Sequence, residues 1–564
     1  MKEKIAAIFT CGLFLSNTAF AEEINAGEIS REAARQAAGE NEENFAESVE
    51  VEDSELESES PENVIAETFV LKGIKIDSDI KDIGYEEVQH IIEPYVNQEV
   101  NINSLKRLAL QIKAYCRQQG WLAAVAYLPE QDSTDGTVTL KIASANFGKV
   151  RFHNESHLAT DILEKVGRNI SNQQMVQNDK IENVLYLINE IRGIKARGAL
   201  IPDAANRAVN LDINVTDDRT QRGIIYVENY GNEKTGRYRS GIIWDDYNID
   251  NRGSRLELSG LISNKDLDNF VADYSWISDR KTTSRLGVSI GRTTYHQIPT
   301  KPIEGLDNFT LDAGGHSTDF RFYGTTPVWK TIHDGFVWNY GYKFRDYTQT
   351  VSYDWDGIQL ARSQGNYYIH TFSLGFNGYR RSLSNDLFNY SFTVYDGYVS
   401  PRSEDALQQA VITGNRGNFF RAVVNLDYRK LFAKEFEFHT NFTGQLASKD
   451  LTGAEQMTIG GANGVRGYAD GDGPADKGFL SKSEVIWYTP IQNLSLSTFF
   501  DIGGAGVKSE RGIKTIRSWG FEANYAKPND FFVKMDYARK IGNNRLVASD
   551  STRQRFWFMV GKIF

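Results

Sequence analysis

The chain has 564 residues, with 63 Lys and Arg against 74 Asp and Glu, so its formal net charge is −11. Its mean hydropathy is −0.44, and beyond the N-terminus it has no apolar run near the about 20 residues that a membrane-spanning helix needs. These values exclude helical membrane spans but are compatible with a transmembrane β-barrel, whose strands alternate apolar and polar residues. No strong basic patch is present, so we expect no nucleic-acid partner.

The N-terminus has the pattern of a secretory signal peptide. Residues 1–21, MKEKIAAIFTCGLFLSNTAFA, combine early lysines, a short apolar core and an Ala-Phe-Ala end. The alternative is a short buried helix. Cys11 is not preceded by the small residue that a lipid-attachment site needs. After cleavage Cys116 alone remains, so no internal disulfide forms; we interpret Cys116 as a core residue.

Acidic residues gather in one tract after the signal peptide. Between Glu22 and Glu62 there are fifteen acidic residues against Arg31 and Arg35, so the rest of the chain is about neutral. Residues 25–38 are rich in helix formers, with Asn25 as the expected N-cap and Glu28 at the capping-box position. An isolated helix of this length is marginal in water, so it needs a surface to dock on. We assign 22–40 to this helix and 41–66 to an acidic, disordered linker.

Two tandem modules follow, each with the order β-α-α-β-β. In the first, 67–146, a strand is expected at 69–76. The helix 102–118 places Leu108, Ile112 and Tyr115 on one face, and Tyr127 and Leu128 end the next strand. The second, 147–217, repeats this order, with strands expected at 149–153, 195–201 and 208–215. Such a module offers a sheet edge and a helix groove to an incoming extended chain; the alternative is that both modules are spacers.

From residue 218 onward the sequence alternates with a period of two. In 421–429, for example, Ala422, Val424, Leu426 and Tyr428 share one parity, and the other parity carries Arg421, Asn425, Asp427 and Arg429. About 16 such segments fit before Phe564, with short turns alternating with longer connections, as in a barrel with lipid outside and water inside. A soluble β-sandwich is the alternative, but the inward set carries too many charges for a dry core.

One glycine-rich connection, GGANGVRGYADGDG at 460–473, lacks the spacing of phosphate-binding loops. It lies in an outward connection, 449–477. Downstream, the strand parity of LSLSTFFDIGG points Asp501 into the lumen. If the connection folds inward, Arg466 reaches Asp501, Gly464 and Gly467 permit a tight backbone, and Tyr468 packs on the wall. The other interpretation is that both charged residues are solvated and never meet.

These features together resemble a known family. A signal peptide, an early helix, a linker, two modules and a barrel carrying Val465-Arg466-Gly467-Tyr468 and Phe499-x-Asp501-x-Gly503 are similar to the TpsB transporters of two-partner secretion. These are the ShlB/FhaC/HecB-type members of the BamA superfamily. The stretch GWLAAVAYLPEQDSTDGTVTL also resembles the end of that family's first POTRA module, although Trp121 stands where tyrosine is more usual.

The resemblance implies an all-β membrane protein: a 16-stranded antiparallel transmembrane barrel, 218–564, preceded by two periplasmic α+β POTRA domains and an N-terminal plug helix. It implies that the loop motif meets the Phe499, Asp501 and Gly503 wall strand. The plug-helix residues are expected to be Glu28, Arg31, Glu32 and Arg35. The expected capture residues are Leu108, Ile112, Tyr115, Tyr127 and Leu128.

The implied function is export of an unfolded exoprotein without ATP from the Gram-negative outer membrane. The cargo would carry an N-terminal two-partner-secretion domain. Its identity stays open between a haemolysin, an adhesin, a haem-acquisition protein and a contact-dependent toxin. Further expected partners are outer-membrane lipid and lipopolysaccharide, together with the BAM machinery and periplasmic chaperones during assembly.

Three other functions fit the sequence less well than export does. A passive porin has no use for tandem modules, and a BamA-like insertase shares the loop motif but usually carries more modules. An outer-membrane enzyme is not favoured, because the sequence has none of the catalytic or metal-binding motifs HExxH, CxxC and GxSxG. The fragments at 354–357 and 470–473 lack the later ligands of calcium loops. We therefore expect no catalytic residue, no metal and no cofactor.

Overall fold

The computed structural model describes residues 21–38, 51–53, 68–81, 83–203, 205–206, 208–279, 283–300, 308–382, 386–506, 512–542 and 552–564. These residues form two compact units, one with residues 1–44 and 219–564 and the other with 45–218. The expected signal peptide, except its last residue, lies outside the described residues. So does most of the expected linker.

The 45–218 unit contains both predicted modules. The first has the helices α3 (Tyr85–Ile92) and α4 (Ile102–Gln118), and the second has α5 (Thr160–Gly167) and α6 (Asn178–Asn189). A short 3₁₀ helix, η2 (Glu93–Tyr95), follows α3. In the first module the strands are β2 (Phe69–Val70), β3 (Gly73–Ser78), β4 (Glu99–Val100), β5 (Ala124–Tyr127) and β6 (Thr137–Ser144). In the second they are β7 (Asn146–Asn154), β8 (Ile194–Asp203) and β9 (Ala208–Asp217).

Sheet pairing explains one difference in the first module. The strand expected at 69–76 divides, because β2 pairs with β4 whereas β3 pairs in parallel with β6. The main sheet has the order β3-β6-β5, so β5 is an edge strand. Helix α4 begins and ends where the apolar periodicity predicted, and its N-terminus is capped by Asn101, which accepts from the Ser104 N–H.

The linker was predicted to lack structure throughout, and this is wrong at one point. Residues 51–53 form β1 (Val51–Asp53), which pairs in parallel with β8 and extends the second sheet to β1-β8-β9-β7. The physical reason is that β8 would otherwise expose an unpaired edge, which is a template for another strand. The alternating VEVED sequence supplies a segment with strand propensity.

The other unit is a closed antiparallel barrel of 16 strands, which confirms the predicted fold class. The strands are β10 (Gln221–Glu228), β11 (Arg239–Tyr247), β12 (Arg255–Ser263), β13 (Asp266–Asp279), β14 (Ser284–Thr300), β15 (Phe309–Lys330), β16 (Asp334–Trp355), β17 (Ile358–Arg381), β18 (Leu387–Pro401), β19 (Gly417–Ala433), β20 (Phe436–Ala447), β21 (Lys477–Tyr488), β22 (Leu494–Gly506), β23 (Lys514–Ala526), β24 (Phe531–Ile541) and β25 (Gln554–Ile563). Each pairs with its neighbour in sequence, and β25 closes on β10. Outward positions carry large exposed apolar side chains such as Phe270, Phe372 and Phe521.

The two ends of the barrel differ in their connections. At the near end, where β10 begins and β25 finishes, the turns within the barrel have seven residues or fewer, as at 248–254 and 527–530. At the far end the connections include α7 (Glu404–Thr413), with Ser403 as its N-cap, and the long segment 448–476. We call 448–476 the inner loop, because many of its residues are buried within the barrel unit.

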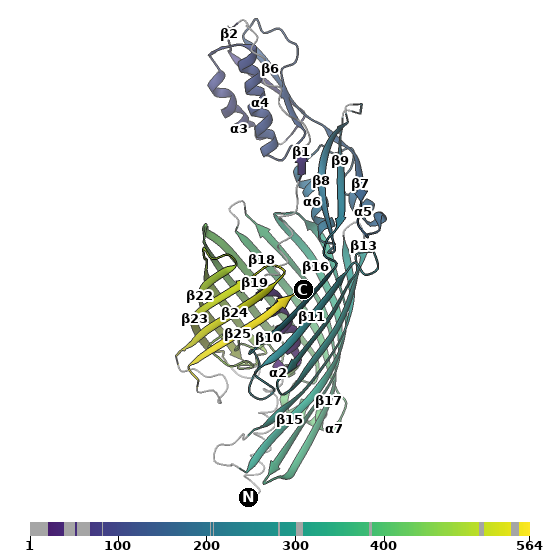
Figure 1. Cartoon of the computed structure of the whole chain (residues 1–564), viewed down its shortest axis with the longest axis vertical. Coiled ribbons are helices and arrows are strands. Elements are labelled where there is room, and N and C mark those ends of the chain that lie inside the picture. The colour runs from purple at the N-terminus through teal and green to yellow at the C-terminus, as the bar shows by residue number, and fades with distance from the viewer. Residues whose placement is uncertain are drawn as a thin grey trace. The chain divides into compact units, whose positions relative to one another are not determined.

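Helix α2 (Ala21–Ala37) also belongs to this unit and lies inside the barrel (Figure 1). It was expected to begin at Asn25, and this is wrong: the helix starts a turn earlier, because Ala21, Glu22 and Glu23 are good helix formers. Asn25 is therefore an interior residue, and its side chain is available for contacts with the inner loop and the wall.

Candidate functional site in the barrel lumen

The inner loop places the side chain of one arginine, Arg466, against the inner surface of the barrel wall. Arg466 is 1% exposed. It makes a two-pronged contact with Asp501 on β22, Nε to Oδ2 at 3.0 Å and Nη2 to Oδ1 at 2.8 Å, and its own backbone N–H donates to the same carboxylate at 3.1 Å. The structure therefore brings together the two charged residues that strand parity suggested as partners.

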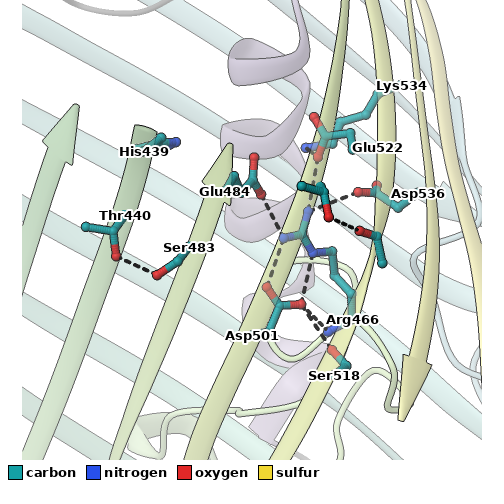
Figure 2. A network of polar contacts seen from close by, with 12 residues as sticks. His439, Thr440, Arg466, Ser483, Glu484, Asp501, Ser518, Glu522, Lys534 and Asp536 are labelled. Atoms are coloured by element: carbon teal, nitrogen blue, oxygen red, sulfur yellow. Dashed lines mark hydrogen bonds and ion pairs between the residues drawn. The ribbon is translucent and has the colours of Figure 1, made fainter. Parts of the chain in front are cut away.

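Three more carboxylates surround the same guanidinium, each from a different strand (Figure 2). Arg466 lies 2.7 Å from Glu484 on β21, 3.1 Å from Glu522 on β23 and 3.1 Å from Asp536 on β24. Glu522 and Asp536 are directly opposite each other in the sheet. Because like charges in that position repel, Arg466 stabilises a wall surface that would otherwise be unfavourable.

The remaining residues of the two motifs make room for the arginine and support it. The Phe499 ring lies 3.3 Å from the Arg466 guanidinium carbon, a cation–π contact. A Cβ at Gly503 would lie 2.3 Å from Ile459 Cγ2, so only glycine lets the inner loop approach β22 this closely. Val465 and Tyr468 are buried in one apolar cluster with Ile459 and Ile516.

The loop backbone is also tied to the last strand. Trp557 on β25 donates its indole N–H to the Arg466 carbonyl at 2.8 Å. Ser518 on β23 donates to Asp501 at 3.2 Å. No sequence motif had singled out Glu484, Ser518, Glu522, Asp536 or Trp557 as partners of the loop. The alternation of each strand predicts that these side chains face the lumen. It does not predict which lumen-facing residues lie at the same depth in the barrel.

Helix α2 contacts the wall through polar side chains. Arg31 donates to Ser259 at 2.8 Å and pairs with Glu257 at 3.2 Å on β12. Arg35 pairs with Asp245 on β11 at 2.8 Å and with Glu257 at 3.0 Å. Arg31 and Arg35 therefore both face one acidic part of the wall.

The two acidic plug-helix candidates differ from the arginines. Glu28 faces a lumenal cavity and makes no hydrogen bond or ion pair with any described residue. Glu32 accepts from Gln36 of the same helix at 3.5 Å. Ser30, which has no sequence signal of its own, is buried, and its hydroxyl lies within hydrogen-bond distance of Tyr226 Oη and Glu228 Oε1 on β10.

Helix α2 and the inner loop meet at Arg345 of β16. Arg345 holds Asp319 of β15 with two bonds, at 2.8 and 2.7 Å. It donates to the Ala454 carbonyl of the inner loop at 3.1 Å and lies 3.5 Å from the Asn25 side-chain oxygen. Asn25 in turn donates to the same Ala454 carbonyl at 3.4 Å. One wall residue thus joins both elements that occupy the lumen.

The candidate capture residues of the first module divide into two groups. Leu108 and Ile112 are completely buried in the core that α3, α4 and the sheet share, so the structure assigns them to packing rather than to a surface contact. Tyr115 and Leu128 are half-buried, and Tyr127 is 45% exposed on the edge strand β5. Of the five, Tyr127 is the one that lies open on a sheet edge.

The described residues offer neither a metal site nor a membrane-spanning helix. No three His, Cys, Asp or Glu side chains in the described ranges are grouped so that they would hold a metal ion. No helix in the described part of the chain has the length and apolar character to cross a membrane.

A closed 16-stranded barrel with an inward loop, a lumenal helix and preceding α+β modules defines an outer-membrane transporter of the POTRA-barrel class. Residues 208–525 match the family described as "Haemolysin secretion/activation protein ShlB/FhaC/HecB", and residues 69–144 match the ShlB-type POTRA domain. The first match covers more than half of the chain. The chain therefore belongs to the ShlB/FhaC/HecB family.

Curated relatives agree with this assignment. The heme/hemopexin transporter protein HuxB of Haemophilus influenzae is 25% identical over 511 residues, which are 88% of this chain and 87% of HuxB. The outer membrane transporter CdiB of Dickeya dadantii is 20% identical over 421 residues, 72% of this chain and 70% of CdiB.

Solved structures show the same fold. CdiB from Escherichia coli superposes with a TM-score of 0.66 at 17% identity, covering 96% of this chain and 98% of CdiB. CdiB from Acinetobacter baumannii gives 0.60 at 15% identity, covering 96% and 99%. BamA from Haemophilus ducreyi, lacking POTRA domains 1–3, gives 0.50 at 15% identity, covering 88% and 100%, and is a likeness of fold alone. The chain is a two-partner-secretion translocator of the outer membrane, with its POTRA domains in the periplasm.

Proposed function

We propose that this translocator is closed at rest by α2 and the inner loop, and that export requires α2 to leave the lumen. One observation carries the proposal. The hydrogen bonds that join α2 to the wall come from side chains, as at Ser30, Arg31 and Arg35. Because α2 is not a strand of the sheet, it can leave without breaking the barrel.

The motif residues would keep the inner loop in place during this change. Val465, Arg466, Gly467 and Tyr468 form the loop side of the contact, and Phe499, Asp501 and Gly503 form the wall side. Arg466 contacts four buried or half-buried carboxylates, so its removal takes the arginine partner from all of them, and only Glu522 keeps an ion pair with Lys534. Breaking a buried arginine–carboxylate contact costs about 3–5 kcal/mol. Arg466 alone contacts four carboxylates, whereas Arg31 and Arg35 of α2 share two, Asp245 and Glu257. We therefore expect the inner loop to stay on the wall when α2 leaves.

Capture of the exoprotein would use a POTRA sheet edge. The β5 edge of the first module carries the exposed Tyr127, whereas the β8 edge of the second is covered by β1. An extended cargo segment adding to β5 would gain backbone hydrogen bonds and a contact with Tyr127. We therefore assign first contact to β5.

The cargo we propose belongs to haem acquisition. HuxB is named as a heme/hemopexin transporter, and it matches more of this chain at higher identity than CdiB of Dickeya dadantii does. Growth on heme–hemopexin as the iron source, with and without this chain, tests the assignment; equal growth contradicts it.

The proposal includes no catalytic chemistry by this chain. Export without ATP would be driven by folding of the cargo outside the cell. Lipopolysaccharide would contact the outward barrel face, and the BAM machinery with periplasmic chaperones would assemble the barrel. Export that continues in purified vesicles after ATP depletion would support transport without ATP, and loss of export would contradict it.

Export itself is tested by the amount of exoprotein in the medium. The variants to compare with the intact chain are Arg466→Ala and a chain lacking residues 68–215. Arg362→Ala is the control, because its side chain is exposed and β17 is not a neighbour of the strands that carry the motif contacts. Loss of export in Arg466→Ala and in the deletion variant, but not in the control, supports the proposal if the barrels are still heat-modifiable. Unchanged export in every variant refutes it, and a general loss of outer-membrane proteins would favour the BamA-like insertase.

Closure is tested in planar bilayers. Deleting residues 28–38 should raise channel conductance, because it removes the part of α2 that carries Ser30, Arg31 and Arg35. A heat-modifiable barrel with unchanged conductance would show that α2 does not close the channel.

A further inference from the structure

A basic surface lines the lumen beside α2. Arg321 on β15 and Lys343 on β16 are directly opposite each other in the sheet, and Arg345 follows Lys343 at the next inward position. Arg421 on β19 completes the group, which we call the basic patch. Arg321, Lys343 and Arg421 border one cavity of about 400 Å³ that Glu28 of α2 also lines.

The four cations are unequally neutralised. Arg345 is held by Asp319, and Arg421 by Glu455 of the inner loop at 3.0 Å. Lys343 lies 3.9 Å from Asp319, an anion that Arg345 already engages. Arg321 lies over the Tyr323 ring at 4.4 Å and makes no ion pair with a described residue.

Glu28 supplies negative charge to this surface from α2. Two cations directly opposite each other in a sheet repel, and the Arg321–Lys343 pair has this arrangement. Glu28 lines the same cavity as both of these cations. When α2 leaves, the patch keeps four cations against Asp319 and Glu455 alone.

We propose that the basic patch binds carboxylate side chains of the polypeptide in transit, and that Glu28 occupies it at rest. The proposal rests on the departure of α2 described above. Its evidence is that a peptide segment already lies in the lumen with a carboxylate toward this surface. The cavity beside Glu28 leaves room for a second carboxylate without moving the wall.

The same helix shows that the patch is local. Arg31 and Arg35, about 4.5 and 10 Å further along the helix at 1.5 Å per residue, meet Asp245 and Glu257 instead. A polypeptide in transit would therefore pass an acidic and a basic surface at different depths. Binding of an acidic peptide and binding of a basic peptide should therefore be weakened by different substitutions in the lumen.

The experiment uses the full chain in planar bilayers. The substitutions Arg31→Ala and Arg35→Ala provide a background in which α2 leaves more often. Short poly-glutamate or poly-lysine peptides are added on the POTRA side, and the duration of each channel block is measured. The test variant is Arg321→Gln with Lys343→Gln. The matched control is Lys265→Gln with Lys434→Gln, which removes the same charge from exposed connections.

The proposal expects poly-glutamate blocks to shorten by about threefold or more in the test variant, as for two exposed ion pairs. Poly-lysine blocks and the control variant should not change. Unchanged poly-glutamate blocks, or equal shortening for both peptides, would overturn the proposal.

A second measurement does not depend on channel opening. Glu28→Lys should lower the heat-modification temperature of the barrel more than Glu28→Gln does, because it sets a third cation against Arg321 and Lys343. Glu32→Lys serves as a control on the same helix. Equal shifts for Glu28→Lys and Glu28→Gln would count against the patch, whereas a background that never opens would count against the departure of α2.

Discussion

At the scale of single residues, Arg466 decides whether four carboxylates can share one surface. The four carboxylates lie on four consecutive strands, β21 to β24. Lys534 helps by pairing with Glu522 at 3.2 Å. Only a planar guanidinium has enough donors to reach carboxylates on several sides, so lysine is no substitute here.

We predict that Arg466→Lys and Arg466→Ala both expose the inner loop to added protease on whole cells. The lysine variant keeps the charge but loses the two-pronged bond to Asp501, so it should resemble alanine more than wild type. The measurement is the appearance of a cut within 448–476. Full protection of the lysine variant would show that charge alone suffices.

The second prediction at this scale concerns Cys116. It is completely buried on α4, and burial raises the pKa of its thiol. A raised pKa keeps the thiol protonated and unreactive near neutral pH. A maleimide should therefore label the folded mature protein poorly and the denatured protein fully. Rapid labelling of the folded chain would place Cys116 at the surface.

At the scale of elements, α2 fits its wall through one close approach. A Cβ at Gly27 would lie 1.9 Å from Asn269 Oδ1 on β13. We predict that Gly27→Val pushes α2 from the wall and raises the frequency of channel openings in planar bilayers. Gln36→Val, at an exposed position of the same helix, controls for helix propensity. Equal effects of the two would mean that packing at Gly27 is unimportant.

The helix and the inner loop are also coupled to each other through Arg345. We predict that Arg345→Met raises channel opening and inner-loop proteolysis together, because Arg345 contacts Ala454 of the loop and Asn25 of the helix. Arg321→Met, on the neighbouring strand, should leave proteolysis unchanged. If Arg345→Met changed only one of the two readouts, the elements would move independently.

At the scale of the whole barrel, closure depends on the shortest of its strand pairings. β10 and β25 pair over five positions, from Ile224 with Ile563 to Glu228 with Met559. Beyond β25, Phe564 exchanges two backbone bonds with Gly223, at 2.7 and 2.9 Å. A Cβ at Gly223 would lie 2.2 Å from the Phe564 ring, so the ring packs directly on this glycine.

We predict that removing Phe564 lowers the amount of heat-modifiable barrel in the outer membrane. The variant loses the two bonds that end the closing pair and the ring that packs on Gly223. Phe564→Tyr, which keeps the backbone and the ring, should retain most of the barrel. Full assembly without Phe564 would show that the other β10–β25 pairs close the barrel unaided.

The sequence by itself determined the elements and their inward faces. Alternation with a period of two identified the barrel strands, and helical periodicity identified the bounds of α4. The same parity pointed Asp501 inward and suggested Arg466 as its partner. These features depend on residues near one another in the chain, so local patterns carry them.

Only the tertiary structure decided which inward residues meet. Parity gives the face of a strand, whereas the register around a closed barrel gives the height of each residue, and that register is a property of all 16 strands together. Glu484, Glu522 and Asp536 therefore join Arg466, and Arg345 joins α2 to the inner loop, without a local sequence signal. The strand β1 was decided in the same way, by the sheet edge on which it docks.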